Sequence, residues 1–163
     1  MNNSPLNKKN SFMPLGIAFL LCFMWWGYLF FATDMQILAD AAGYEELAAV
    51  IKNQGWEYYF RSGPHREPFY PSLIAVSMRL GDIFYCSYQS VQKFFQIAIL
   101  FLTQILMLIL LKRLNVSCGI SALAVLYFGL SPAMVNSAFS LFSEILVYPW
   151  VLLIVLFFSC VWE

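Results

Sequence analysis

The stretch FFQIAILFLTQILMLILL, residues 94–111, contains no charged side chain and decides the fold class. A helix needs roughly 20 mostly apolar residues to cross the hydrocarbon core of a bilayer. Three further uncharged runs of similar length occupy residues 10–33, 114–143 and 145–162. We therefore predict an all-α integral membrane protein with about four transmembrane helices, at about 13–33, 92–111, 119–137 and 143–162.

The composition supports a membrane protein. Hydrophobic residues make up 61% of the chain and charged residues 11%, whereas about 25% of residues are charged in a soluble domain. Nine basic and nine acidic residues cancel, so no overall field attracts nucleic acid, and we expect the lipid bilayer as partner instead. Four cysteines with only Cys86 in the long polar segment indicate packing residues, not a disulfide framework.

The basic residues predict the orientation. Lys8 and Lys9 precede the first span, which is too long for a signal peptide, and Lys112 and Arg113 separate the second span from the third. The positive-inside rule places both pairs in the cytoplasm. We therefore expect a multi-pass protein of the cell membrane with a cytoplasmic tail, residues 1–12, and one membrane domain, residues 13–163. Its large loop, residues 34–91, is expected to be extracytoplasmic.

This loop is expected to hold two interfacial helices. In DAAGYEELAAVIKNQG, residues 40–55, the apolar side chains recur at helical spacing, and Gly55 is the expected stop. The members of this stripe are Tyr44, Leu47, Ala48 and Ile51. FYPSLIAVSMRLGD, residues 69–82, reads as a second helix that is too short to cross, with Gly81 near its end.

Two acidic residues are candidates for chemistry, and each has a structural alternative. Glu144 is an isolated ionisable group in an otherwise uncharged stretch, and such groups tend to be functional; alternatively it is hydrated at the outer start of a helix. Asp40 is either the cap of a helix beginning near Ala41 or an interior residue. The second case follows if Thr33 and Gln36 form a capping box that starts the helix earlier.

The turn SGPHREPFYPSL, residues 62–73, brings His65 and Arg66 together. Arginine offers a planar set of donors suited to phosphate, so these two residues are candidates for anion binding. The alternatives are a solvated turn or an attraction to lipid headgroups. With a single histidine in the chain, we see no ligand set for a metal, and we expect no cofactor.

Two motifs in the loop, together with Glu144 later in the chain, resemble the pattern of a known protein family. One motif has the form Asp-x-x-x-Tyr-x-x-Leu-Ala and the other Arg-x-Pro-x-Tyr-Pro, and Glu144 opens a later hydrophobic run after LSPAMVNSAFSLFS. Their order resembles the N-terminal part of GT-C membrane glycosyltransferases, in the dolichyl-phosphate-mannose protein mannosyltransferase-like family that includes aminoarabinose-transferase-like enzymes. The matching positions are Asp40, Tyr44, Leu47 and Ala48, then Arg66, Pro68, Tyr70 and Pro71.

The resemblance implies an inverting transfer of a sugar from a polyprenyl-phosphate donor to a glycan, lipid or protein acceptor on the extracytoplasmic side. It implies Asp40 as the general base, with Asp34 as the alternative, and Glu144 as a residue that orients the acceptor or the base. Arg66 with His65 is implied to bind the donor phosphate. Tyr44 and Tyr70 are implied to line the substrate cavity.

Family members are usually several hundred residues long with many more spans, so the resemblance covers only their N-terminal portion. A fragment, a truncated gene product and a reduced relative all fit this length, and all three leave independent activity as an open question. The alternative function is a small non-catalytic multi-pass membrane protein or remnant that acts as an assembly partner.

Overall fold

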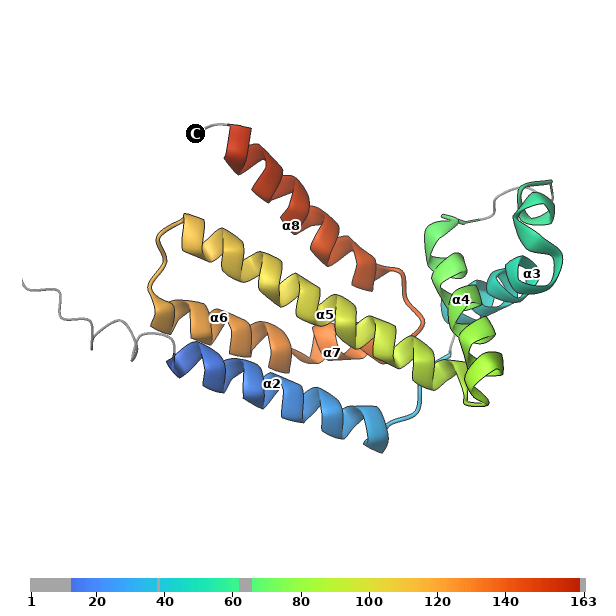
Figure 1. The fold of residues 1–163 in the computed structure, drawn as a ribbon, viewed down its shortest axis with the longest axis horizontal. Coiled ribbons are helices and arrows are strands. Elements are labelled where there is room, and N and C mark those ends of the chain that lie inside the picture. The colour runs from blue at the N-terminus through green and yellow to red at the C-terminus, as the bar shows by residue number, and fades with distance from the viewer. Residues whose placement is uncertain (1–12, 38, 62–65, 162–163) are drawn as a thin grey trace, which may run out of the picture.

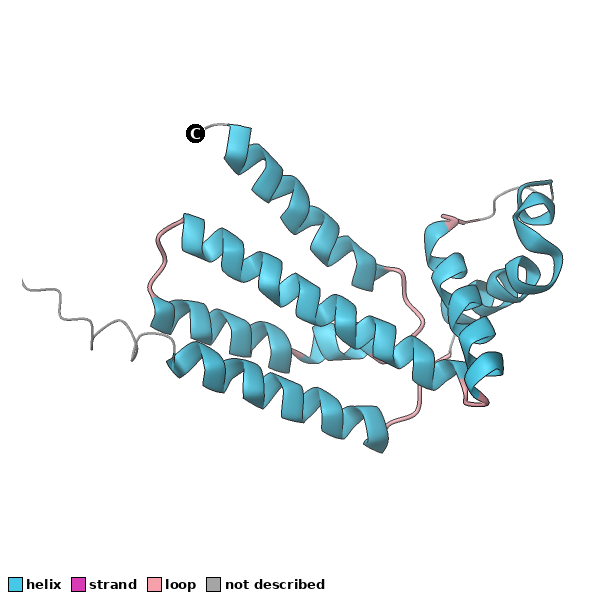
Figure 2. Cartoon of the chain, viewed as in Figure 1, coloured by secondary structure: helices cyan, strands magenta, loops and turns pink. Residues whose placement is uncertain are grey.

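The computed structural model describes residues 13–37, 39–61 and 66–161, and every regular element in these ranges is a helix. Figure 1 shows the helices in chain order, and Figure 2 shows the loops between them. The helices are α2 (Met13–Ala32), α3 (Asp40–Arg61), α4 (Phe69–Phe84), α5 (Tyr88–Arg113), α6 (Cys118–Leu130), α7 (Pro132–Ala138) and α8 (Glu144–Val161).

The helices form an elongated bundle with a small two-helix unit at one end (Figure 1). In the bundle, α2 packs against α6, and α5 packs against α8. At the end of the bundle, α3 packs against α4, and the Lys52 ammonium lies 2.6 Å from the Asp82 carboxylate between them. The turn that carries Lys112 and Arg113 lies at the opposite end (Figure 1).

Two helices, α2 and α5, are long and apolar enough to cross a membrane. The pair α6 and α7 becomes a third crossing if it is counted as one span, although its two helices meet at a bend of 53°. The apolar part of α8, Glu144–Ser159, is shorter. The structure is therefore that of a helical membrane-associated protein, and the fourth span stays a prediction.

The bend between α6 and α7 has a local cause. Pro132 is the first residue of α7 and has no backbone N–H to donate to the preceding turn. Proline is favoured at a first helical position, where that N–H has no intrahelical partner. The helix therefore restarts at Pro132 in a new direction and does not continue straight from Leu130.

The apolar stripe predicted in the loop is confirmed, because Tyr44, Ala48 and Ile51 are buried along one face of α3. Gly55 breaks the helix at the expected position, because its φ of 82° and ψ of 175° are not helical. This φ lies in the left-handed region that glycine adopts without strain, and a second run of helical turns follows the kink as far as Arg61. Similarly, α4 continues past Gly81 to Phe84.

The expected capping box at Thr33 and Gln36 is wrong. The Thr33 hydroxyl donates back to the carbonyl oxygen of Leu29 at 2.7 Å, and the backbone of Gln36 forms an isolated parallel bridge with Ser140. This tertiary contact holds the 33–37 segment extended, so α3 begins only at Asp40. Asp40 is therefore at the start of its helix and not in the interior.

Polar contacts join the apolar helices inside the bundle. The Trp26 indole nitrogen donates to the Gly129 carbonyl oxygen at 2.7 Å, and the Gln104 side-chain nitrogen donates to the Val125 carbonyl oxygen at 3.2 Å. These bonds hold α2, α5 and α6 in register. Gly129 has no space for a side chain, because an added Cβ would overlap the Cys22 sulfur.

The cysteines differ from one another in position. Cys22 is buried between helices, as expected of a packing residue, and Cys118 is half-buried. Cys86 is exposed in the turn between α4 and α5, so the expectation that it is a packing residue is wrong.

Candidate functional site

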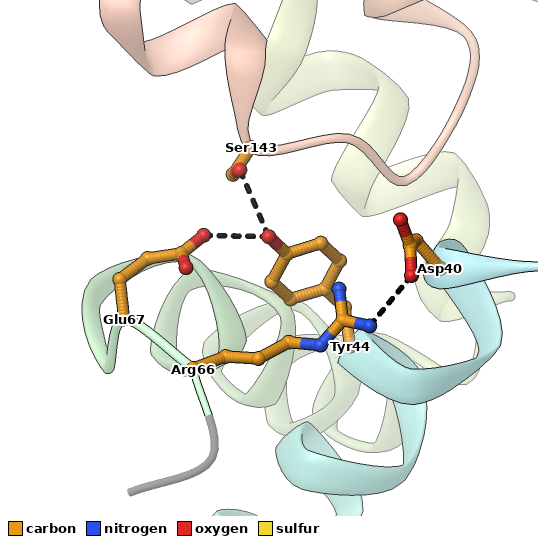
Figure 3. Close-up of polar contacts among 5 residues, drawn as sticks. All are labelled: Asp40, Tyr44, Arg66, Glu67 and Ser143. Carbon is orange, nitrogen blue, oxygen red and sulfur yellow. Dashed lines mark hydrogen bonds and ion pairs between the residues drawn. The ribbon is translucent and has the colours of Figure 1, made fainter.

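An ion pair links the start of α3 to the segment before α4. The Arg66 guanidinium nitrogen Nη2 lies 2.7 Å from the Asp40 carboxylate oxygen Oδ1. The guanidinium also stacks over the ring of Tyr44, 4.6 Å from its centroid (Figure 3). Stacking on an aromatic face is typical of arginine and fixes the plane in which its N–H groups point. Asp40 and Arg66 thus share one surface at the end of the bundle.

The hydroxyl of Tyr44 joins this pair to the start of α8. It donates to the Glu67 carboxylate at 2.7 Å, and its oxygen lies 3.0 Å from the Ser143 hydroxyl oxygen (Figure 3). Tyr44 is buried in the apolar stripe of α3, so its ring is held while its hydroxyl contacts side chains outside that helix. Three segments that are remote in sequence therefore meet at one tyrosine.

A second layer supports Tyr44 and Arg66 from behind. The edge of the Tyr70 ring meets the Tyr44 ring with centroids 5.1 Å apart, and the Tyr59 hydroxyl donates to the Arg66 carbonyl oxygen at 2.8 Å. The buried Gln96 amide donates to both the Tyr70 hydroxyl, at 2.8 Å, and the Ser140 carbonyl oxygen, at 2.9 Å. Through Gln96, α5 fixes both α4 and the segment that leads into α8.

Electrostatics favours a charged Glu67 and a neutral Tyr44. Burial alone would raise the pKa of the Glu67 carboxyl, but hydrogen bonds from Tyr44, its own backbone N–H and Ser143 bring this pKa below its ordinary value, with help from the Arg66 charge. Burial raises the pKa of Tyr44, and the neighbouring Glu67 contributes to the same shift. The hydrogen bond to Asp40 raises the pKa of the Arg66 guanidinium.

Glu144 lies next to this cluster, at the first position of α8, where it is exposed. The preceding residue, Ser143, contacts Tyr44 directly. Burial raises the pKa of Tyr70, and the negative charge of Glu144 adds to that effect. Of the two carboxylates named from the sequence, Asp40 thus shares α3 with Tyr44, and Glu144 directly follows a residue that contacts Tyr44.

The remaining candidate residues that the structure describes do not belong to the contacts around the Tyr44 hydroxyl. Tyr70 is fully buried behind Tyr44. Asp34 lines a separate cavity beside α2. His65 lies outside the described residues. Within the described ranges, no group of three or more histidine, cysteine, aspartate or glutamate residues is placed to hold a metal ion.

Sequence reasoning did not assign a role to Glu67 or Ser143. Each directly follows or precedes a residue that it did single out: Glu67 follows Arg66, and Ser143 precedes Glu144. Adjacency in sequence was therefore the available signal. Adjacency does not indicate which group each residue contacts. In the structure, both residues contact the hydroxyl of Tyr44.

Comparison of the chain with protein-family models, with curated protein sequences and with solved structures gives no match. The cluster itself is therefore the basis for a functional argument. It offers a solvent-facing carboxylate beside a fixed guanidinium, a combination suited to hold an anion and to accept a proton next to it.

Proposed function

We propose that the chain is a membrane glycosyltransferase, or the N-terminal portion of one, that transfers a sugar from a polyprenyl-phosphate donor to an acceptor on the extracytoplasmic side. The observation that carries the proposal is the 2.7 Å contact between Asp40 and Arg66 above the Tyr44 ring. It pairs a base with a phosphate-binding group on the same surface, as such a transfer requires.

The proposed orientation rests on the positions of the basic residues at one end of the bundle. The cluster and the helices α3 and α4 lie at one end of the bundle, and the basic turn at Lys112 and Arg113 lies at the other (Figure 1). With the basic turn in the cytoplasm, the cluster faces outward at the depth of the lipid headgroups. A donor whose lipid tail stays in the membrane presents its phosphate at that depth.

In the proposed reaction, Asp40 removes the proton from the acceptor hydroxyl as its oxygen attacks the anomeric carbon of the sugar. The bond from that carbon to the phosphate oxygen breaks, and the phosphate leaves with the electron pair. Arg66 stabilises the charge that develops on the leaving phosphate. Glu144, which follows Ser143 at the start of α8, orients the acceptor.

The ion pair gives the proposal a specific order of events. The guanidinium carries five N–H donors, more than one contact to Asp40 uses. A bound phosphate competes with the carboxylate for this cation, which leaves Asp40 free to accept a proton. Tyr44 keeps the guanidinium in place during the exchange, because its stacking contact does not depend on Asp40.

The test is donor turnover in membranes that contain the full chain. A polyprenyl-phosphate-linked sugar is supplied, and the release of polyprenyl phosphate is followed for the unsubstituted chain, for Asp40→Asn and for the control Glu46→Gln. Glu46 is exposed on the same helix. We expect the Asp40 variant to turn over donor about 100-fold more slowly or worse and the control to be unchanged.

The same experiment addresses the non-catalytic alternative. An apolar groove lined by Phe23, Phe30, Phe94 and Phe101 runs between α2 and α5 and is suited to helix packing. An assembly partner would bind there without needing Asp40. No turnover above background by the unsubstituted chain therefore supports the non-catalytic alternative and contradicts the enzyme, whereas equal turnover by the unsubstituted chain and by Asp40→Asn contradicts Asp40 as the base.

A further inference from the structure

A cavity of about 670 Å³ opens beside the outer end of α2, away from the Asp40 and Arg66 pair. Its walls come from the last turns of α2, the extended segment at 33–36 and the bend between α6 and α7. The bend at Pro132 turns α7 out of line with α6 by 53°. The cavity is therefore a consequence of the broken helix.

One wall of the cavity is apolar. Trp25 and Leu29 contribute from α2, and Leu130 and Val135 contribute from the two sides of the helix break. All four belong to segments of the apolar bundle, so this wall continues the lipid-facing surface of the protein. A hydrocarbon chain fits against such a wall, because it loses no hydrogen bonds on leaving the bilayer.

The rim of the cavity is polar and has unused hydrogen-bonding capacity. Asp34, Gln36 and Asn136 line it with exposed side chains. Within the described part of the chain, none of these three side chains makes a hydrogen bond or an ion pair. By contrast, the Thr33 hydroxyl already donates to Leu29.

The negative charge of Asp34 at the rim determines which kind of headgroup the cavity favours. Lys93 is the nearby cation, but its ammonium donates to the carbonyl oxygens of Phe30, at 2.6 Å, and Thr33, at 2.9 Å, and so is held at the end of α2. Among the described residues, no cation makes an ion pair with the Asp34 carboxylate, and Lys93 acts on it only through its charge. A carboxylate repels an anionic headgroup and accepts charge-assisted hydrogen bonds from an ammonium group.

We propose that this cavity binds an amphiphile with a primary amine head and a hydrocarbon tail. The ammonium donates to Asp34, with Asn136 as a second acceptor, and the tail lies along Trp25, Leu29 and Val135. The inference stands apart from the proposed function, because it uses neither Asp40 nor Arg66. It adds a cation site at a place separate from the cluster that offers an anion site.

The test uses the full chain in phosphatidylcholine nanodiscs, which supply no primary amine. ω-Bromododecylamine is titrated, and quenching of Trp25 by the tail bromine reports occupancy. We expect saturable quenching that disappears in Trp25→Phe, since Trp25 lines the cavity. ω-Bromododecanoate, which carries a carboxylate on a comparable tail, is expected to bind about tenfold more weakly or worse.

Substitutions separate the head contact from general charge. Asp34→Asn is expected to weaken amine binding by about tenfold or more, whereas Glu46→Gln, which removes an exposed charge on α3, is expected to leave it unchanged. Ala133→Phe narrows the cavity without altering its charge and is expected to weaken the binding of both probes. A thermal-unfolding scan of each variant without probe verifies that it is folded.

Three results overturn the inference: equal affinity for the amine and the carboxylate, unaltered amine binding by a folded Asp34→Asn variant, or quenching that rises without saturation and persists in Trp25→Phe. The last result is the signature of simple partition into the bilayer. Donor turnover is measured separately, so failure here leaves the transfer reaction standing, and failure of the transfer reaction leaves the cavity standing.

Discussion

The phenolic oxygen of Tyr44 lies 3.0 Å from the hydroxyl oxygen of Ser143, a residue 99 positions further along the chain. This contact joins the first helix of the predicted loop to the residue immediately before α8. Because the same phenol also donates to Glu67, Tyr44 is the point at which the candidate site is held together.

Replacing Tyr44 by phenylalanine removes the hydroxyl but keeps the ring under Arg66. We expect the free energy of unfolding to fall by about 1–2 kcal/mol, because both Glu67 and Ser143 lose a partner. Thermal unfolding in detergent measures the change. Tyr127→Phe is the matched control, since Tyr127 is 83% exposed. An unaltered unfolding midpoint for Tyr44→Phe contradicts the claim that the Tyr44 hydroxyl holds the site together.

Replacing Gly129 by alanine tests the packing of the bundle. The added Cβ would overlap the Cys22 sulfur and lie 2.8 Å from the Gln104 side-chain nitrogen. We expect a loss of about 1–3 kcal/mol in unfolding free energy from this overpacking. Gly27→Ala is the control, because its Cβ meets nothing within 4 Å. Alanine has the higher helix propensity, so the control is expected to be neutral or slightly stabilised.

The pH dependence of stability is predicted from Glu67, whose folded-state pKa is lowered. A lowered pKa means that the ionised carboxylate stabilises the fold at pH values above the ordinary glutamate pKa of about 4.3. This contribution is lost as the pH falls through the folded-state pKa. Glu67→Gln removes it at every pH, so the unfolding midpoints of the two proteins are expected to differ at pH 7 and to converge below about pH 4. A constant difference contradicts the assignment.

Labelling of Cys86 tests the proposed orientation. Cys86 is exposed in the turn between α4 and α5, so a membrane-impermeant maleimide added to intact cells is expected to modify it. The experiment uses a chain with Cys118→Ser and Cys160→Ser, in which Cys22 stays buried. A cysteine placed at Lys112 in a Cys86→Ser chain is expected to react only after permeabilisation. The reverse pattern places the site in the cytoplasm.

Local pattern was sufficient to predict the helices that carry the site. The stripe of Tyr44, Ala48 and Ile51 follows helical spacing, and all three side chains are buried. The apolar runs likewise predicted α2 and α5, since length and hydropathy alone identify a helix able to cross a membrane.

Contacts between segments that are remote in sequence could not be predicted from such local patterns. Thr33 and Gln36 have the spacing of a capping box, yet the Gln36 backbone pairs with the segment around Ser140. That tertiary bridge overrides the local preference and moves the start of α3 to Asp40. For the same reason, the sequence placed Arg66 and Asp40 in one loop but gave no sign that Tyr44 connects them to Ser143.

Cross-linking of residue 67 to residue 143 tests the central claim most directly. Glu67 and Ser143 both contact the Tyr44 hydroxyl. A short bifunctional thiol reagent is therefore expected to link cysteines at these two positions in native membranes, in a chain with Cys86, Cys118 and Cys160 replaced by serine. A reagent with a spacer is used because a direct disulfide needs Cβ atoms about 4 Å apart. Glu46 is exposed on the same helix as Tyr44 but outside its buried stripe, and a cysteine there is expected not to pair with residue 143. Peptide mass spectrometry reads both outcomes. A cross-link from position 67 and none from position 46 is the predicted result. Failure of the 67–143 pair to form, in a protein that is otherwise folded, contradicts the account.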